Sequence, residues 1–274
     1  MVNNYSVLMS VYFKDRADWL KEAIDSIINQ TVKTNDFVIV CDGELSKELY
    51  EVLDFYDEKF PGLFNIVKRE KNYGLGPSLA FGLDLCKNEL VARMDSDDIS
   101  HVDRCEKELQ KFEENSELAI VGCWESEFES SPNKPIAIHK VPSGTKEVYQ
   151  FMKRRCSLLH PTVIYKKSLV QMCGNYHDVR LFEDYDLFMR MIVEYNFQGD
   201  NVSEALYDMR VNDAFYKRRG GLKYLRTIVR FKKEQRKKRY MSFKDYFISR
   251  WTQTIVCLMP NRMRKWFYIK FLRK

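Results

Sequence analysis

Residues 90–100 read LVARMDSDDIS, and the rest of the chain is best interpreted outward from this stretch. Residues 90–94 are mostly apolar and predict a buried strand. Three carboxylates, Asp95, Asp97 and Asp98, follow this strand directly. Because ligands of parallel α/β sheets bind beyond the carboxyl ends of the strands, we expect a functional site here.

The chain on either side alternates between strand and helix patterns. Apolar runs rich in β-branched residues predict strands, and apolar residues spaced three and four apart predict helices. The predicted strands are 5–12, 37–41, 64–68, 90–94 and 118–124, and the predicted helices are 17–29, 45–60, 77–86 and 104–112. Five strands joined by four helical crossovers indicate an α/β fold with a Rossmann-like, mostly parallel, doubly wound sheet.

The pattern is less regular after residue 125. Residues 126–144 are rich in Pro and Ser and lack periodicity, so we expect a loop that contains His139 without a function for it. The further predicted elements are helices at 146–155, 168–173 and 182–194 and a short strand at 160–165.

The acidic motif at 95–98 has two explanations. Three carboxylates within four residues repel one another unless a cation or hydrogen-bond donors compensate, and such a group suits a hard divalent ion. A solvated acidic turn that caps the following helix accounts for the motif equally well. The motif alone leaves both explanations open.

Other short motifs accompany it in a fixed order. They are AIDSI at 23–27, DG at 42–43, NYGLGPSLA at 72–80, HPT at 160–162 and EDYDL at 183–187. Together with ARMDSDDIS at 92–100, they make the chain resemble bacterial family 2 glycosyltransferases of the GT-A fold, in particular those that build capsular polysaccharides and exopolysaccharides. The resemblance extends over about residues 5–215.

The resemblance implies a domain division and a reaction. It implies a GT-A catalytic domain over 1–216, with a nucleotide-sugar-binding half over about 1–124 and an acceptor-binding half over 125–216. The implied activity is an inverting, metal-dependent transfer of a hexose from a nucleotide sugar, which we expect to be UDP-linked. The implied acceptor is a lipid-linked saccharide or a polysaccharide.

The resemblance also implies roles for individual residues. The residues implied to bind the nucleotide sugar are Ser10, Tyr12, Asp42, Arg93, Asp95 and Ser96. Asp97 is implied as a ligand of Mn²⁺ or Mg²⁺, with Asp95 and His160 as further ligands. The family more often has a second acid before the DG turn, where this chain has Cys41. Arg93 is equally well explained as a surface ion-pair partner, and His160 as a structural residue before a proline.

Asp184 is the expected general base. In the resembling enzymes the acid at this helix start removes the proton from the acceptor hydroxyl, and Glu183 is the substitute if the helix is rotated. The alternative is that acids at 183–186 only favour the positive end of a helix.

The C-terminal segment 217–274 differs sharply in charge from the rest. It holds 20 Lys and Arg against two acids, a net charge of +18, whereas residues 1–216 carry −12. Aromatic residues recur every four positions after residue 243. A basic, aromatic-rich amphipathic helical extension is typical of docking to an anionic membrane surface. Packing on the catalytic domain or on a twin subunit, which implies a homodimer, is the second possibility, and nucleic-acid binding is a distant third.

The remaining patterns concern location and rival functions. Seven scattered cysteines without a CxxC pair indicate free thiols, and the absence of a signal peptide predicts a cytoplasmic protein, peripheral on the inner face of the cell membrane. Two rival functions remain. One is a non-catalytic nucleotide-sugar-binding assembly protein, and the other is a phosphatase with Asp95 as nucleophile, although Asp98 stands where such a motif needs Thr or Val.

Overall fold

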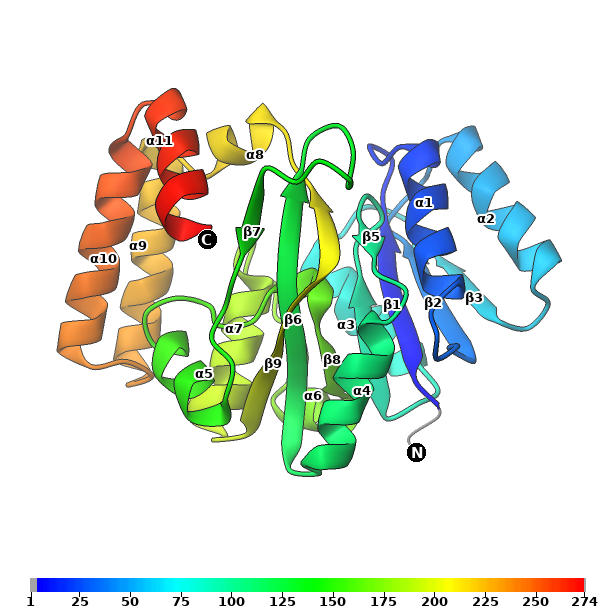
Figure 1. Ribbon diagram of the computed structural model, residues 1–274, viewed down its shortest axis with the longest axis horizontal. Helices are drawn as coiled ribbons and strands as arrows, with labels where there is room; N and C mark the ends of the chain where they lie inside the picture. The colour runs from blue at the N-terminus through cyan, green and yellow to red at the C-terminus, as the bar shows by residue number, and fades with distance from the viewer. Residues whose placement is uncertain (1–3, 274) are drawn as a thin grey trace.

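The computed structural model describes residues 4–273. In this part of the chain nine strands form one sheet with helices on both faces (Figure 1). The strands are β1 (Ser6–Val11), β2 (Asp36–Cys41), β3 (Phe64–Lys68), β4 (Leu90–Met94), β5 (Ile99–Ser100), β6 (Leu118–Phe128), β7 (Ala137–His139), β8 (Ile164–Lys166) and β9 (Gln198–Arg210). The α-helices are α1 (Ala17–Ile28), α2 (Lys47–Lys59), α3 (Leu75–Leu85), α4 (Arg104–Glu114), α5 (Thr145–Met152), α6 (Lys167–Met172), α7 (Glu183–Met189), α8 (Asp213–Arg218), α9 (Gly221–Lys237), α10 (Phe243–Leu258) and α11 (Asn261–Phe267). Three short turns complete the list: a 3₁₀ turn at His160–Thr162 and π-turns at Arg190–Glu194 and Tyr268–Leu272.

The long strands of the sheet share one direction. The strand order is β3-β2-β1-β4-β8-β6-β9-β5, and β7 pairs with the outer part of β6. Strands β1 to β4 pair in parallel, as do β6 and β9, whereas the short strands β5, β7 and β8 run against their neighbours. The expectation of a mostly parallel, doubly wound sheet is confirmed, and the carboxyl ends of β1, β2, β4 and β6 lie along one edge.

Two apolar cores lie on opposite faces of this sheet. Alternate residues of β1 enter different cores, since Val7 and Met9 pack with α1, α2 and α4, whereas Leu8 packs with α3 and α7. This alternation follows from the two-residue period of a strand. Strands covered on both faces read as continuous apolar runs, which is why β1, β2 and β4 were predictable.

The expected loop at 126–144 is wrong in two places. Strand β6 continues to Phe128, and β7 pairs with it antiparallel through Glu125↔His139 and Glu127↔Ala137. The pattern was hidden because Glu125 and Glu127 are buried carboxylates in a strand. The expected strand at 160–165 is also partly wrong, because residues 160–162 form the 3₁₀ turn and only β8 is extended. Strands β5 and β9 were not predicted.

The C-terminal helices pack on the body at several places. Helix α9 contributes Ile228 and Phe231 to the same core as α7, and α10 lies beside α9 at the edge of the molecule (Figure 1). The expected boundary after residue 216 falls inside α8. Among residues 4–273, no helix combines the length and the apolarity that crossing a bilayer requires.

Candidate active site

A cavity of about 520 Å³ opens at the carboxyl edge of the sheet. Such a volume is typical of a small-molecule site. The acidic turn after β4, the turn at 160–162, α7 and the C-terminal helices all contribute to its lining. Five of the residues expected from the sequence line it together, namely Asp95, Asp97, His160, Glu183 and Asp184. Ser10, Tyr12, Asp42, Arg93 and Ser96 are not among its lining residues.

The acids after β4 form a compact group. Asp95, Asp97 and Asp98 each offer a carboxylate oxygen, and these oxygens all lie within 4.8 Å of one another. Burial, and then the charge of Asp95, raises the pKa of Asp97 to about 6. Burial and the other two acids raise the pKa of Asp98 well above its usual range. Three crowded carboxylates, of which Asp97 and Asp98 have raised pKa values, fit a hard divalent cation such as Mn²⁺ or Mg²⁺.

Strand β9 fixes the conformation of this acidic turn. The Asp98 carboxylate accepts the backbone N–H of Arg210 at 2.7 Å, and the Arg210 side chain donates to the carbonyl of Asp97 at 3.0 Å. The backbone N–H of Asp95 donates to the Tyr207 hydroxyl at 3.2 Å. Asp98 is only 3% exposed and holds the turn through its hydrogen bond to Arg210, and all three acids line the cavity.

Arg93 and His160 form a buried layer behind Asp95. Arg93 is fully buried, so its alternative explanation as a surface residue is wrong, and it donates to the Asp95 carboxylate and to the Met94 carbonyl. His160 Nε2 faces Arg93 Nε at 3.5 Å and the Tyr176 hydroxyl at 3.1 Å. Burial, and then the charge of Arg93, holds the pKa of His160 well below its usual value. The neutral imidazole therefore supports Arg93, and the three-carboxylate group described above does not include it.

The end of β1 brings a further acid to the site. Asp15 accepts from Ser96 Oγ at 2.7 Å and from the backbone N–H of Tyr12 at 3.0 Å. Burial raises the pKa of Asp15 to about 7. No sequence pattern singled out Asp15, because it stands in a charged run after the strand. Ser96 thus ties the acidic turn to the β1 loop, and Tyr12 remains 40% exposed beside it.

Asp42 holds a neighbouring loop. Its two carboxylate oxygens accept the backbone N–H groups of Tyr73 and Gly74, at 2.8 and 2.9 Å. Gly43 has φ +87°, and a Cβ there would lie 2.7 Å from the backbone nitrogen of Asn72. The β2 turn therefore positions the loop before α3, and Asp42 is 3% exposed.

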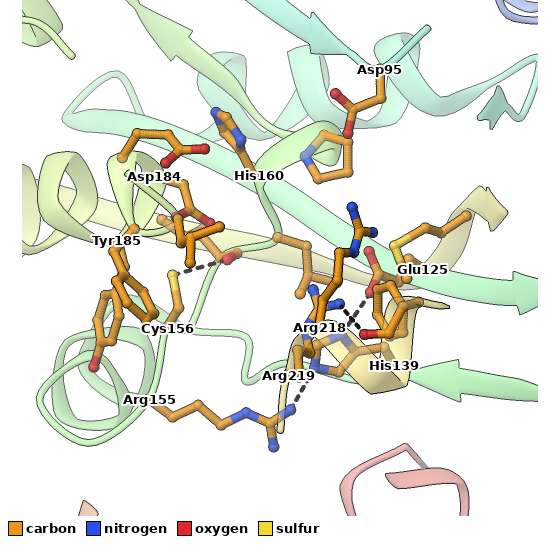
Figure 2. Close-up of a pocket in the computed structure, with 18 of the residues that line it drawn as sticks. Asp95, Glu125, His139, Arg155, Cys156, His160, Asp184, Tyr185, Arg218 and Arg219 are labelled. Carbon is orange, nitrogen blue, oxygen red and sulfur yellow. Dashed lines mark hydrogen bonds and ion pairs between the residues drawn. The ribbon is translucent and has the colours of Figure 1, made fainter. Parts of the chain in front are cut away.

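Asp184 and Glu183 face the same cavity from the start of α7. Burial raises the pKa of Asp184, although the charges of Arg219 and Arg93 act in the opposite direction. Burial, and then the charge of Asp184, raises the pKa of Glu183 to about 7. A carboxylate with a raised pKa is a better proton acceptor than a solvated one. In Figure 2, His160 lies between Asp184 and Asp95.

A chain of polar residues that was not predicted from the sequence lies under the cavity. Glu125 Oε1 lies 2.7 Å from His139 Nδ1, and His139 Nε2 lies 2.9 Å from Arg155 Nη2 (Figure 2). Glu127 forms an ion pair with Arg273 near the end of the chain, Nε to Oε1 2.5 Å. Charged residues 14 to 146 positions apart carry no local signal, so only the fold could reveal these pairs.

Comparison with known proteins agrees with this geometry. Residues 6–170 match the family model described as "Glycosyl transferase family 2". The chain is 35% identical over 270 residues to the "UDP-Gal:alpha-D-GlcNAc-diphosphoundecaprenol beta-1,3-galactosyltransferase" of Escherichia coli, covering 98% of this chain and 97% of the relative. It is 29% identical over 269 residues to the "Amylovoran biosynthesis glycosyltransferase AmsE" of Erwinia amylovora, covering 97% and 98%.

Solved structures share the fold at low identity. The mannosyltransferase PcManGT from Pyrobaculum calidifontis, in complex with GDP-Man and Mn²⁺, has a TM-score of 0.63 at 14% identity, covering 85% of this chain. S. aureus TarS 1-349 in complex with UDP-GlcNAc has a TM-score of 0.62 at 18% identity, covering 82%. The chain spans 64% and 65% of the lengths of these two structures. The fold is therefore GT-A, and the chain is a glycosyltransferase that belongs to glycosyl transferase family 2.

Proposed function

We propose that this enzyme is an inverting, metal-dependent hexosyltransferase of surface polysaccharide biosynthesis. Its donor is a UDP-linked hexose, and its acceptor is a lipid-linked saccharide or a growing polysaccharide. Two relatives support this proposal, since one is named for a UDP-galactose donor and a diphosphoundecaprenol acceptor and the other for amylovoran biosynthesis.

One observation carries the proposal. The same cavity is lined on one side by the three-carboxylate group at Asp95, Asp97 and Asp98 and on the other by Asp184. A glycosyl transfer needs a place for the leaving nucleoside diphosphate and a base for the incoming hydroxyl. An isolated acidic turn that only caps a helix would need no second carboxylate across a cavity.

The residues of the chain account for a single displacement. Asp184 takes the proton from the acceptor hydroxyl, whose oxygen forms the new bond to the anomeric carbon. The bond from that carbon to the donor phosphate oxygen breaks, and its electron pair leaves with the nucleoside diphosphate. Attack from the face opposite the leaving group inverts the anomeric configuration. Arg93, buried behind Asp95, keeps that carboxylate directed toward the cavity.

Asp97 and Asp95 would hold the divalent cation. The crowding of their carboxylates with that of Asp98 fits such an ion. When bound, Mn²⁺ or Mg²⁺ offsets the charge of the departing diphosphate. Burial raises the pKa of Asp15 to about 7, so Asp15 is only partly ionised near neutral pH and adds only part of a negative charge beside the cation site.

We further propose that α10 docks on the anionic cytoplasmic face of the membrane. Phe243, Phe247, Trp251 and Ile255 lie on one face of the helix and are 51–69% exposed. The rings of the first three contact one another in sequence, and the body of the protein does not cover them. An aromatic stripe beside the bases of a +18 segment suits an acidic lipid surface.

Vesicle binding tests the docking proposal. Phe247→Ala and Trp251→Ala should reduce co-sedimentation with phosphatidylglycerol vesicles, and added salt should weaken binding of the wild type. Phe55→Ala is the control, because Phe55 is also 51% exposed but lies on α2. Equal losses in all three variants, or salt-independent binding, would contradict the proposal.

A transfer assay with two matched variants tests the catalytic proposal. We expect Asp184→Asn to lower kcat by about 10² to 10⁴ while UDP affinity is unchanged. Glu183→Gln, at the adjacent position, should retain most activity. If Glu183→Gln shows the large loss instead, Glu183 is the base. If the wild type binds nucleotide sugars but neither transfers nor hydrolyses them, the non-catalytic alternative holds.

A further inference from the structure

The lining of the cavity is strongly basic as well as acidic. Its cationic lining residues are Arg154, Arg155, Arg210, Arg218, Arg219, Lys232 and Arg273. Most of these are already engaged: Arg154 pairs with Asp245, Arg210 with Glu22 and Arg273 with Glu127. Lys232 donates to the Tyr185 hydroxyl and to the carbonyl of Arg154.

Arg155 and Arg219 stand out from the other cations. Within residues 4–273, neither forms an ion pair with a carboxylate; Arg218 forms none either, but Arg218 is exposed, whereas Arg155 and Arg219 are half-buried. Arg219 contacts the Phe215 ring, with its guanidinium carbon 3.6 Å from the centroid, and makes one long hydrogen bond to a carbonyl. Burial lowers the pKa of both guanidinium groups. Two half-buried charges without a carboxylate in direct contact are costly, and an anion in the cavity would relieve that cost.

Arg155 is held in place by residues under the cavity. His139 is 7% exposed, and burial holds its pKa well below the usual value, so its ring is neutral. Its Nδ1–H donates to Glu125, which leaves Nε2 to accept from Arg155 Nη2 at 2.9 Å. This is the one side-chain hydrogen bond of Arg155 in the described chain, so its other donors remain open to a ligand.

The position of the two arginines separates them from the donor acids. Arg219 lies close enough to Asp184 to lower the pKa of that carboxyl. In Figure 2, Arg155 and Arg219 are on the opposite side of the view from Asp95. An acceptor with its hydroxyl at Asp184 would therefore extend its other end toward these arginines.

We propose that Arg155 and Arg219 form an acceptor subsite that binds the diphosphate linking the acceptor sugar to its lipid. Paired guanidinium groups match phosphate oxygens in geometry and charge. His139 acts as a positioning residue, because it orients Arg155 without reaching the ligand. The inference rests on the proposed function, and it selects a diphosphate-linked lipid over a free polysaccharide as the acceptor.

Binding of three isoprenoid probes tests this inference. Farnesyl diphosphate, farnesyl monophosphate and farnesol carry the same tail, and each is titrated into the full chain with UDP and Mn²⁺ already saturating. We expect the wild type to bind the diphosphate most tightly. Arg155→Gln and Arg219→Gln should each weaken diphosphate binding by about 10-fold or more and leave farnesol binding unchanged. His139→Phe should weaken diphosphate binding as well.

Arg154→Gln is the matched control. Arg154 is adjacent to Arg155 in sequence and lines the same cavity, but it is ion-paired with Asp245. Arg154→Gln should therefore not change the preference for farnesyl diphosphate over farnesol. Unchanged UDP binding in every variant shows that the fold and donor site are intact. Equal binding of the three probes by the wild type would overturn the subsite. A loss of UDP affinity in Arg155→Gln and Arg219→Gln would also overturn the subsite, because it would assign these arginines to the donor site. If the wild type fails to bind UDP, the proposed function itself fails.

Discussion

Phe231 of α9 allows a quantitative test of how the C-terminal helices join the body. Its side chain is 6% exposed, its ring stacks on Phe182 with centroids 4.8 Å apart, and it lies 5.4 Å from the ring of Tyr185. Both partners flank or form the start of α7, which carries the proposed base. Truncating a fully buried Phe to Ala costs about 3 to 5 kcal/mol. At about 2 to 4 °C per kcal/mol, Phe231→Ala should lower Tm by about 6 to 20 °C.

Urea unfolding and thermal melting of two variants measure this effect. Phe247 on α10 is 51% exposed, so Phe247→Ala should change the free energy of unfolding by about 0.5 kcal/mol or less. Phe231→Ala should also lower kcat, because the stacked ring supports α7. If Phe231→Ala melts with the wild type, α9 is a detachable tail and its packing here is refuted.

Three further predictions concern pH, a turn and a buried cation. Because burial raises the pKa of Asp184 and only its ionised form accepts a proton, kcat/KM should fall on acidification through a pKa above the usual aspartate range; a profile that is flat down to about pH 4 would rule out this base. Gly43→Ala and Gly62→Ala both place a side chain at positive φ, at about 1 to 2 kcal/mol each, but only at Gly43 does the new Cβ meet backbone. Gly43→Ala should therefore have a lower melting temperature than Gly62→Ala in thermal scans, and of the two variants only Gly43→Ala should weaken UDP binding. Equal effects of the two variants would refute the role of this turn. Arg264 is 5% exposed and donates to carbonyls in α8 and α10 and to the carbonyl of Met259. Arg264→Met should therefore lower the free energy of unfolding in urea by about 2 kcal/mol or more, whereas Arg262→Met, at an exposed position, should lower it hardly at all. Similar urea midpoints for the two variants would contradict this prediction.

The parallel half of the fold and the acidic turn after β4 were readable from the sequence. Strands covered on both faces are continuous apolar runs, and Asp95 to Asp98 follow one of them without interruption. The proposed base, Asp184, was also selected from the sequence, through the EDYDL motif and its resemblance. These signals are local, since each lies within about ten residues of chain.

The polar residues of β6 and β7 under the cavity were not readable from the sequence, for physical reasons. Strand β6 carries Glu125 and Glu127 inward, where neutral His139 of β7 donates a hydrogen bond to Glu125 and Arg273 forms an ion pair with Glu127. An alternation of buried charges has the hydropathy of a loop, so the strand end and His139 were both missed. The basic character of segment 217–274 was evident, but only the fold separates its inward residues, such as Lys232, from the exposed aromatic stripe of α10.

The acids after β4 are proposed to form a metal-dependent nucleotide-sugar site. Its most direct test is thermal melting with UDP, with and without Mn²⁺, on the wild type and on Asp97→Ala. UDP at 100 times its dissociation constant should stabilise the wild type by about 2.7 kcal/mol, a shift of about 5 °C or more, and only when Mn²⁺ is present. Asp97→Ala should show no shift. A shift without metal, an equal shift in Asp97→Ala, or none in the wild type would contradict the account.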